Sequence, residues 1–207
     1  MQLFLKSIFG IICFWFSAGV SAQVPVSADD ICPLLIGEII PKAILQDSQG
    51  KQVELGKLLS NKPTVLVFYR GGWCPYCNVQ LSGLVKIEKE ILHLGYQIIA
   101  ISPDEYQNLQ NTESKDSINY TILSDPEAKF IQRVGIGFKT PVMLKGFIAT
   151  KGQKGKASEI MPVPTVMIVD ERSKILFEYI NPNYKERISG ELLLAVLRSL
   201  KPYKWQQ

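Results

Sequence analysis

Residues 64–77 read TVLVFYRGGWCPYC, and this stretch decides the fold. Its first six residues are β-branched, aliphatic or aromatic, which is typical of a buried central strand. Beyond it, apolar residues recur three and four apart, at Leu81, Leu84, Ile87, Ile91 and Leu94. This spacing predicts an amphipathic helix that begins near Cys74 and ends before Gly95. A strand followed by Cys-x-x-Cys at the start of a helix is therefore expected.

The two cysteines of this stretch are placed for thiol chemistry. Residues three apart on a helix share a face, so the sulfurs of Cys74 and Cys77 can close a disulfide. The unpaired N–H groups and dipole at a helix N-terminus favour a thiolate, so we expect the pKa of Cys74 below ~8.5. Pro75 fits the first helical turn. We predict that Cys74 is the exposed, attacking thiol and that Cys77 is the more buried, resolving thiol.

Two other uses of the pair fit the sequence less well. A four-residue loop removes little entropy from the unfolded chain, so a purely stabilising disulfide is a poor use of the pair. A zinc site needs four ligands, and His93 is the only histidine. We expect His93 to cap the end of its helix rather than to act in catalysis.

The rest of the chain alternates strand-like and helix-like segments, which predicts an α/β fold with a central mixed sheet, helices on both faces and an N-terminal β-hairpin. Residues 135–162 are rich in Gly and Lys and are expected to form a long loop. The expected strands are 43–45, 52–55, 64–69, 96–101, 120–123, 165–169 and 174–180, and further helices are expected from about 124 to Val134 and near the C-terminus.

The N-terminal residues resemble a secretory signal. Lys6 precedes an apolar run at 8–19, and residues 20–22 read VSA, so we predict cleavage after Ala22 and an exported, periplasmic protein with no remaining membrane span. A retained anchor is the alternative. The predicted division is 1–22 signal peptide, 23–42 N-terminal extension and 43–201 folded domain. Removal of one lysine and no acid lowers the net charge from +4 to +3, too little to indicate nucleic-acid binding.

Cleavage would leave an odd number of cysteines. Cys13 would be lost, whereas Cys32, Cys74 and Cys77 would remain. Since disulfides persist outside the cell, an odd count leaves at least one thiol free or paired elsewhere. We expect Cys32 to be a buried free thiol.

Residues 68–77 (FYRGGWCPYC), followed by Leu81, resemble the active-site turn of the peroxiredoxin-like branch of the alkyl hydroperoxide reductase/thiol-specific antioxidant (AhpC/TSA) family, in the thioredoxin-like superfamily. Residues 161–165 (MPVPT) are similar to the segment that carries the cis-proline of thioredoxin-fold proteins. The resemblance covers about residues 33–200 and implies a thioredoxin-like fold for 43–201, with no cofactor.

The resemblance also implies roles for single residues. Cys74 would be the nucleophile and Cys77 its partner in a redox-active disulfide. Pro164 would be the cis-proline, which leaves the backbone of Val163 free to pair with a substrate. An ordinary turn proline, or Pro162 in its place, is the alternative. Trp73 would shape the docking surface beside the cysteines, or be a plain core residue.

Two departures from the resemblance bear on mechanism. Thioredoxins carry a buried acid six residues before the first cysteine, but Phe68 stands there, so acid-assisted proton transfer is not expected. Peroxiredoxins have a proline and a threonine before one peroxidatic cysteine. Those positions hold Arg70 and Cys74, and the peroxidatic position holds Cys77. Arg70 is the only fixed cation expected nearby.

The leading hypothesis is an exported thiol–disulfide oxidoreductase that exchanges with protein or small-molecule thiols and disulfides and with an unidentified electron donor or acceptor. A thiol peroxidase is the second hypothesis. A non-enzymatic module that binds Cu(I) or zinc through the same pair is the third.

Overall fold

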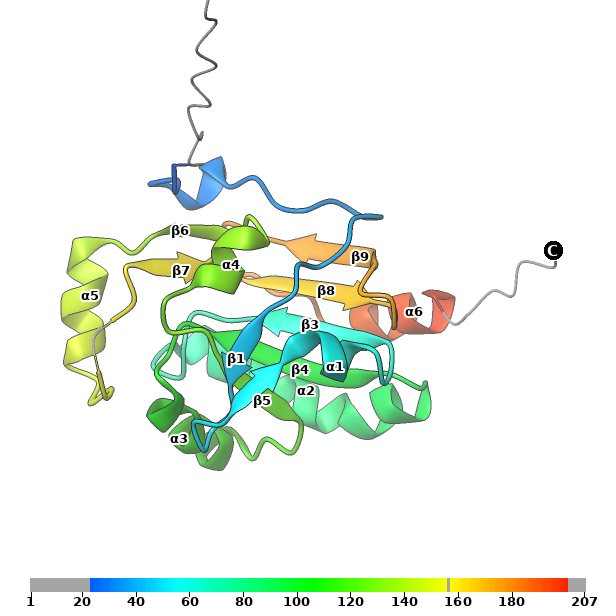
Figure 1. Ribbon diagram of the computed structural model, residues 1–207. Coiled ribbons are helices and arrows are strands. Elements are labelled where there is room, and N and C mark those ends of the chain that lie inside the picture. The colour runs from blue at the N-terminus through cyan, green and yellow to red at the C-terminus, as the bar shows by residue number, and fades with distance from the viewer. Residues whose placement is uncertain (1–22, 156, 201–207) are drawn as a thin grey trace, which may run out of the picture.

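The computed structural model describes residues 23–155 and 157–200. Seven strands form one sheet in the order β2-β1-β5-β4-β3-β8-β9, and β6 pairs with β7 in a separate two-stranded sheet (Figure 1). The strands are β1 (Ile44–Gln46), β2 (Gln52–Glu54), β3 (Thr64–Phe68), β4 (Gln97–Ser102), β5 (Thr121–Ser124), β6 (Gly137–Lys139), β7 (Ile160–Pro162), β8 (Thr165–Val169) and β9 (Ile175–Ile180).

The central sheet is mixed, as predicted. β3, β4 and β5 run parallel, whereas the hairpins β1–β2 and β8–β9 are antiparallel. Helices flank both faces: α1 (Leu55–Leu59), α2 (Pro75–His93), α3 (Tyr106–Asp116), α4 (Lys129–Arg133), α5 (Val142–Ala149) and α6 (Gly190–Leu200).

Two apolar cores separate these faces. Alternate residues of β3 point to opposite sides, as in any strand. Val65 and Val67 join the core under α2 and α6, whereas Leu66 and Phe68 join the core under α1 and α4. All five residues of β3 are buried, and the strand lies in the interior of the sheet between β4 and β8, as the continuous apolar run predicts.

The N-terminal hairpin is also confirmed. Leu45 lies opposite Val53, and the carboxylate of Asp47 accepts hydrogen bonds from the N–H groups of Gln49 and Lys51 at 3.0 and 2.9 Å. These bonds form the turn between the two strands.

Two predictions along the chain are wrong. Residues 135–162 are not a loop: they form β6, α5 and β7, elements too short to show a sustained period. The helix expected from residue 124 begins only at Lys129, because Ser124 still belongs to β5 and Ala128 adopts a positive φ of 52°. The Asp125 carboxylate instead accepts the N–H of Ile131 at 2.9 Å.

The predicted signal peptide, residues 1–22, lies outside the described residues, and the division between 23–42 and 43–201 stays a prediction. Among the helices that the structure describes, none combines the length and apolar character needed to cross a membrane.

Candidate active site

The cysteine pair lies at the junction of β3 and α2. Cys74 is the N-cap residue of α2, with Pro75 in its first turn, as the sequence predicts. Cys74 and Cys77 are free thiols here, and both are buried, with exposed fractions of 1% and 0%. The prediction of an exposed Cys74 is wrong, because its side chain joins the core beneath α2 together with Trp73 and Ile188.

The two thiols have opposite protonation preferences. A hydrogen bond from the Cys77 thiol lowers the pKa of Cys74 to about 6, with help from the Cys77 N–H and from the charges of Arg70 and Arg187, although burial opposes this. Burial raises the pKa of Cys77, and so does its hydrogen bond to Cys74. The causes of both shifts favour the thiolate at Cys74 and the proton on Cys77.

Two arginines flank the pair. The Arg70 Cζ atom lies 5.1 Å from the ring centroid of Trp73 and 4.3 Å from that of Tyr184. Arg187 Nη2 donates to Cys77 Sγ at 3.8 Å. Tyr184 also packs edge-on against Tyr76, with ring centroids 5.6 Å apart. The segment between β9 and α6 thus lies against the active-site turn.

Arg187 was missed at the sequence level, where Arg70 is the only nearby cation expected. More than 100 positions separate Arg187 from Cys77 in the chain. Only the packing of the β9–α6 segment brings them together, and no local pattern in the sequence indicates it.

A buried acid also lies beside the turn. Asp104 follows β4, and its Oδ2 accepts the Gly72 N–H at 2.8 Å. Burial, with a smaller contribution from the Cys74 charge, raises its pKa to about 7 against the hydrogen bonds from Gly72 and Ser102, which lower it. Phe68 thus leaves the position six residues before Cys74 without an acid, but the end of β4 supplies a carboxyl to the same turn, which the sequence did not indicate.

Gly71 makes this close approach possible. Its φ of 139° is rarely adopted by L-residues, and a Cβ there would lie 2.3 Å from Trp73 Nε1 and 2.6 Å from Asp104 Oδ1. Trp73 is 8% exposed and meets Phe147 of α5 edge-on at 6.3 Å between centroids. It therefore lies in the core beside the cysteines.

The cis-proline prediction is wrong. No peptide bond among the described residues is cis, so the Val163–Pro164 bond is trans, and Pro162 is not a cis-proline either. The backbone of Val163 is not free: its N–H donates to the Ile136 carbonyl at 2.8 Å, and its carbonyl accepts from Thr165 Oγ1 at 2.9 Å. Val163 is fully buried and cannot pair with a substrate in this arrangement.

Cys32 and His93 both lie on the surface. Cys32 is exposed, which corrects the expectation of a buried thiol, because it lies on the surface segment before β1. His93 is exposed and is the last residue of α2. Within residues 23–155 and 157–200, no group of three or more His, Cys, Asp or Glu side chains could hold a metal ion.

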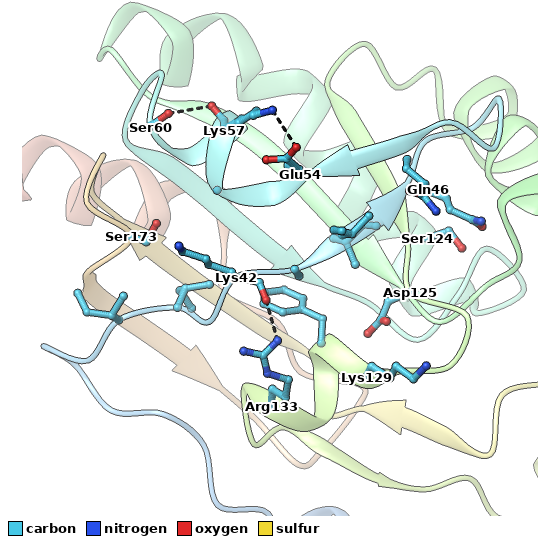
Figure 2. Close-up of a pocket in the computed structure, with 18 of the residues that line it drawn as sticks. Lys42, Gln46, Glu54, Lys57, Ser60, Ser124, Asp125, Lys129, Arg133 and Ser173 are labelled. Atoms are coloured by element: carbon cyan, nitrogen blue, oxygen red, sulfur yellow. Dashed lines mark hydrogen bonds and ion pairs between the residues drawn. The ribbon is translucent and has the colours of Figure 1, made fainter.

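A large cleft of about 1090 Å³ lies elsewhere, between the segment 39–46, α1 and α4 (Figure 2). β1 pairs with β5 at Gln46 and Ser124, and both residues line this cleft. Arg133 Nη1 closes one side by donating to the Lys42 carbonyl at 2.7 Å. The lining includes Leu45 and Phe130, so the cleft is on the sheet face opposite the cysteines.

Comparison with known proteins identifies the family. The model of the AhpC/TSA family matches residues 36–177. The chain belongs to the AhpC/TSA family. Peroxiredoxin Bcp of Escherichia coli (strain K12) is 32% identical over 104 residues, which cover 50% of this chain and 66% of that protein, just under two thirds. The thiol-disulfide oxidoreductase ResA of Bacillus anthracis is 25% identical over 158 residues, 76% of each chain.

A solved structure supports the fold. Peroxidoxin BcpB from Mycobacterium tuberculosis superposes with a TM-score of 0.63 at 21% identity, over 81% of this chain and 98% of that one. The resemblance to AhpC/TSA proteins and the thioredoxin-like fold are thus confirmed, and the relatives named above are oxidoreductases.

Proposed function

We propose that this AhpC/TSA protein is a thiol–disulfide oxidoreductase in which Cys74 attacks and Cys77 resolves. The observation that carries the proposal is the unequal pair. The pKa of Cys74 is lowered to about 6, whereas burial raises that of Cys77. A thiolate is the nucleophile in disulfide exchange, and the optimum attacking thiol has a pKa near the ambient pH.

The reaction proceeds in two steps, formation of a mixed disulfide and its resolution. The Cys74 thiolate attacks one sulfur of a substrate disulfide, which breaks the S–S bond and releases one substrate thiolate. The Cys77 thiol then loses its proton and attacks Cys74 Sγ, which releases the second substrate sulfur. The protein pair is oxidised to a disulfide, and the substrate disulfide is reduced to one thiol and one thiolate.

Single-cysteine variants test the order of attack. Cys74→Ser is expected to abolish exchange, whereas Cys77→Ser is expected to accumulate mixed disulfides through Cys74, detectable by mass spectrometry. Cys32→Ser is the matched control, because Cys32 is an exposed thiol outside the pair. Mixed disulfides that accumulate in Cys74→Ser instead would reverse the assignment.

A second candidate is peroxide reduction, favoured by the name of the E. coli relative, a peroxiredoxin. Here the thiolate becomes a sulfenic acid and the other cysteine resolves it. The position of the peroxiredoxin threonine holds Cys74, so the site lacks that hydroxyl. Stopped-flow mixing of one reduced sample with a disulfide peptide and with hydrogen peroxide separates the two. A peroxide rate several orders of magnitude above that of a free thiolate would establish the peroxidase.

Export belongs to the same proposal. The signal-like residues 1–22 indicate a periplasmic or otherwise exported protein, with protein or small-molecule disulfides as substrates and an unidentified electron donor or acceptor. Measuring the N-terminus of the protein from the periplasmic fraction tests this, with Gln23 as the expected first residue.

A further inference from the structure

The cysteine pair lies beside two arginines that pair with no carboxylate in the part of the chain that the structure describes. Arg70 is 8% exposed, and its Nε atom is buried without a hydrogen-bond partner; the same is true of the Nε atom of Arg187. Across residues 23–155 and 157–200, neither arginine forms a salt bridge. Arg187 as a whole is half-buried. Charges withdrawn from water in proteins are ordinarily paired, so an unpaired buried guanidinium beside a half-buried one favours an anion at this site.

Apart from the Cys74 thiolate, the groups that these arginines contact carry no negative charge. The rings of Trp73 and Tyr184 hold the Arg70 guanidinium by cation–π contact, which fixes its position without neutralising it. Arg187 donates to the Glu186 carbonyl at 2.8 Å and to Cys77 Sγ. Both contacts leave its charge without a carboxylate.

The Cys74 thiolate is a counter-ion only before the reaction. When its sulfur forms a mixed disulfide, the negative charge leaves with the released thiolate, and the two guanidinium groups then face a neutral sulfur. Asp104 does not replace it, because no salt bridge joins its carboxyl to Arg70 and that carboxyl accepts the Gly72 N–H instead.

We propose that Arg70 and Arg187 select anionic substrates, namely disulfides that carry a carboxylate within a few bonds of the sulfur. The inference rests on the proposed function of the pair. Guanidinium groups present N–H edges that match a carboxylate, whereas their faces stack on aromatic rings, as Arg70 stacks here. A carboxylate on the substrate would stay in the site throughout both exchange steps and so replace the lost thiolate charge.

A first experiment measures this preference without any disulfide exchange. Iodoacetate and iodoacetamide alkylate thiolates and differ mainly in charge. The rate ratio, iodoacetate over iodoacetamide, is measured at Cys74 by peptide mass spectrometry and divided by the same ratio for N-acetylcysteinamide. We expect a normalised value of about 10, the effect of one or two unit charges at ~6 Å in a partly screened site. A value of 1 or below overturns the proposal.

Variants assign the preference to the two arginines. Arg70→Met and Arg187→Met are each expected to lower the normalised ratio several-fold, toward 1. Because both rates depend equally on the Cys74 thiolate, the ratio is insensitive to any change in its pKa. Arg198→Met is the matched control: it removes the same charge from α6, where Arg198 pairs with Glu90, and should leave the ratio unchanged. An unchanged ratio in both active-site variants contradicts the proposal.

A second experiment uses disulfides of one backbone and three charges: 3,3′-dithiodipropionate, bis(2-hydroxyethyl) disulfide and cystamine. Because the leaving thiols differ in pKa, each rate is divided by the rate of N-acetylcysteinamide with the same disulfide. The expected order of these normalised rates is anionic, neutral, cationic, and the differences should shrink in Arg70→Met. If the protein reacts with none of the three disulfides but still prefers iodoacetate to iodoacetamide, the proposed oxidoreductase function is refuted and the anion site remains supported. Equal normalised rates with all three would support exchange and refute the selection.

Discussion

Asp104 should make the stability of the reduced protein depend on pH in a defined direction. Burial raises its pKa to about 7 in the folded state, against about 3.9 in an unfolded chain. The folded state therefore holds the proton more tightly. Below about pH 4 the carboxyl is neutral in both states and does not change the free energy of unfolding. As pH rises toward 7, ionisation in the unfolded state lowers the free energy of unfolding, and the full loss is reached above pH 7.

The size of the effect follows from the pKa difference. A shift of about 3 units at about 1.36 kcal/mol per unit gives a cost of about 4 kcal/mol above pH 7, as an upper value. Asp104→Asn removes the ionisation, and its side-chain oxygen can still accept the Gly72 N–H. The variant should be more stable than the wild type at pH 8 by up to about 4 kcal/mol, and by little at pH 4.5.

Urea unfolding of the reduced protein at several values between pH 4.5 and 8 measures this difference. Asp30→Asn is the control, since Asp30 is exposed and its side chain makes no hydrogen bond among the described residues. A difference between Asp104→Asn and wild type that stays constant over this range would refute the reasoning. So would a difference that grows toward acid.

Two more predictions concern the backbone around the site. Gly71→Ala should cost at least ~2 kcal/mol of stability in urea unfolding, because its Cβ would clash with Trp73 and Asp104 at a positive φ; Gly83→Ala, where a Cβ meets nothing within 4 Å, should be neutral or stabilising. Pro164→Ala should change the disulfide-exchange rate less than about 3-fold, since the backbone of Val163 is already hydrogen-bonded. A loss of rate comparable to that of Cys74→Ser would show instead that this segment binds the substrate.

The part of the site that local sequence determines was predictable. The run at 64–68 and the period after Cys77 place a buried strand and a helix around the cysteines without any knowledge of the rest of the chain. The hairpin β8–β9 follows in the same way from two apolar runs and a turn. In each case the signal lies within about 20 residues of the structure that it specifies.

The segment 161–165 marks a limit of resemblance. MPVPT matches the motif of a cis-proline, but here its first residues pair as β7 with β6, at Gly137 and Pro162. The Ile136 carbonyl then takes the N–H of Val163. The partner strand β6, which begins 25 positions before Pro162, therefore decides what this backbone can bind. The motif itself carries no information about that partner strand.

Asp104 was missed for a similar reason, since the acid comes from a strand other than the one that leads into Cys74. β3 and β4 are parallel, with Phe68 opposite Ile101, so the residues that follow each strand emerge at the same edge of the sheet. Gly72 lies four positions past Phe68 and Asp104 three past Ile101, which is why they meet. An apolar residue at position 68 therefore says nothing about whether the site contains an acid. The register of the neighbouring strand decides that, and here it brings a carboxyl to the turn that holds Cys74.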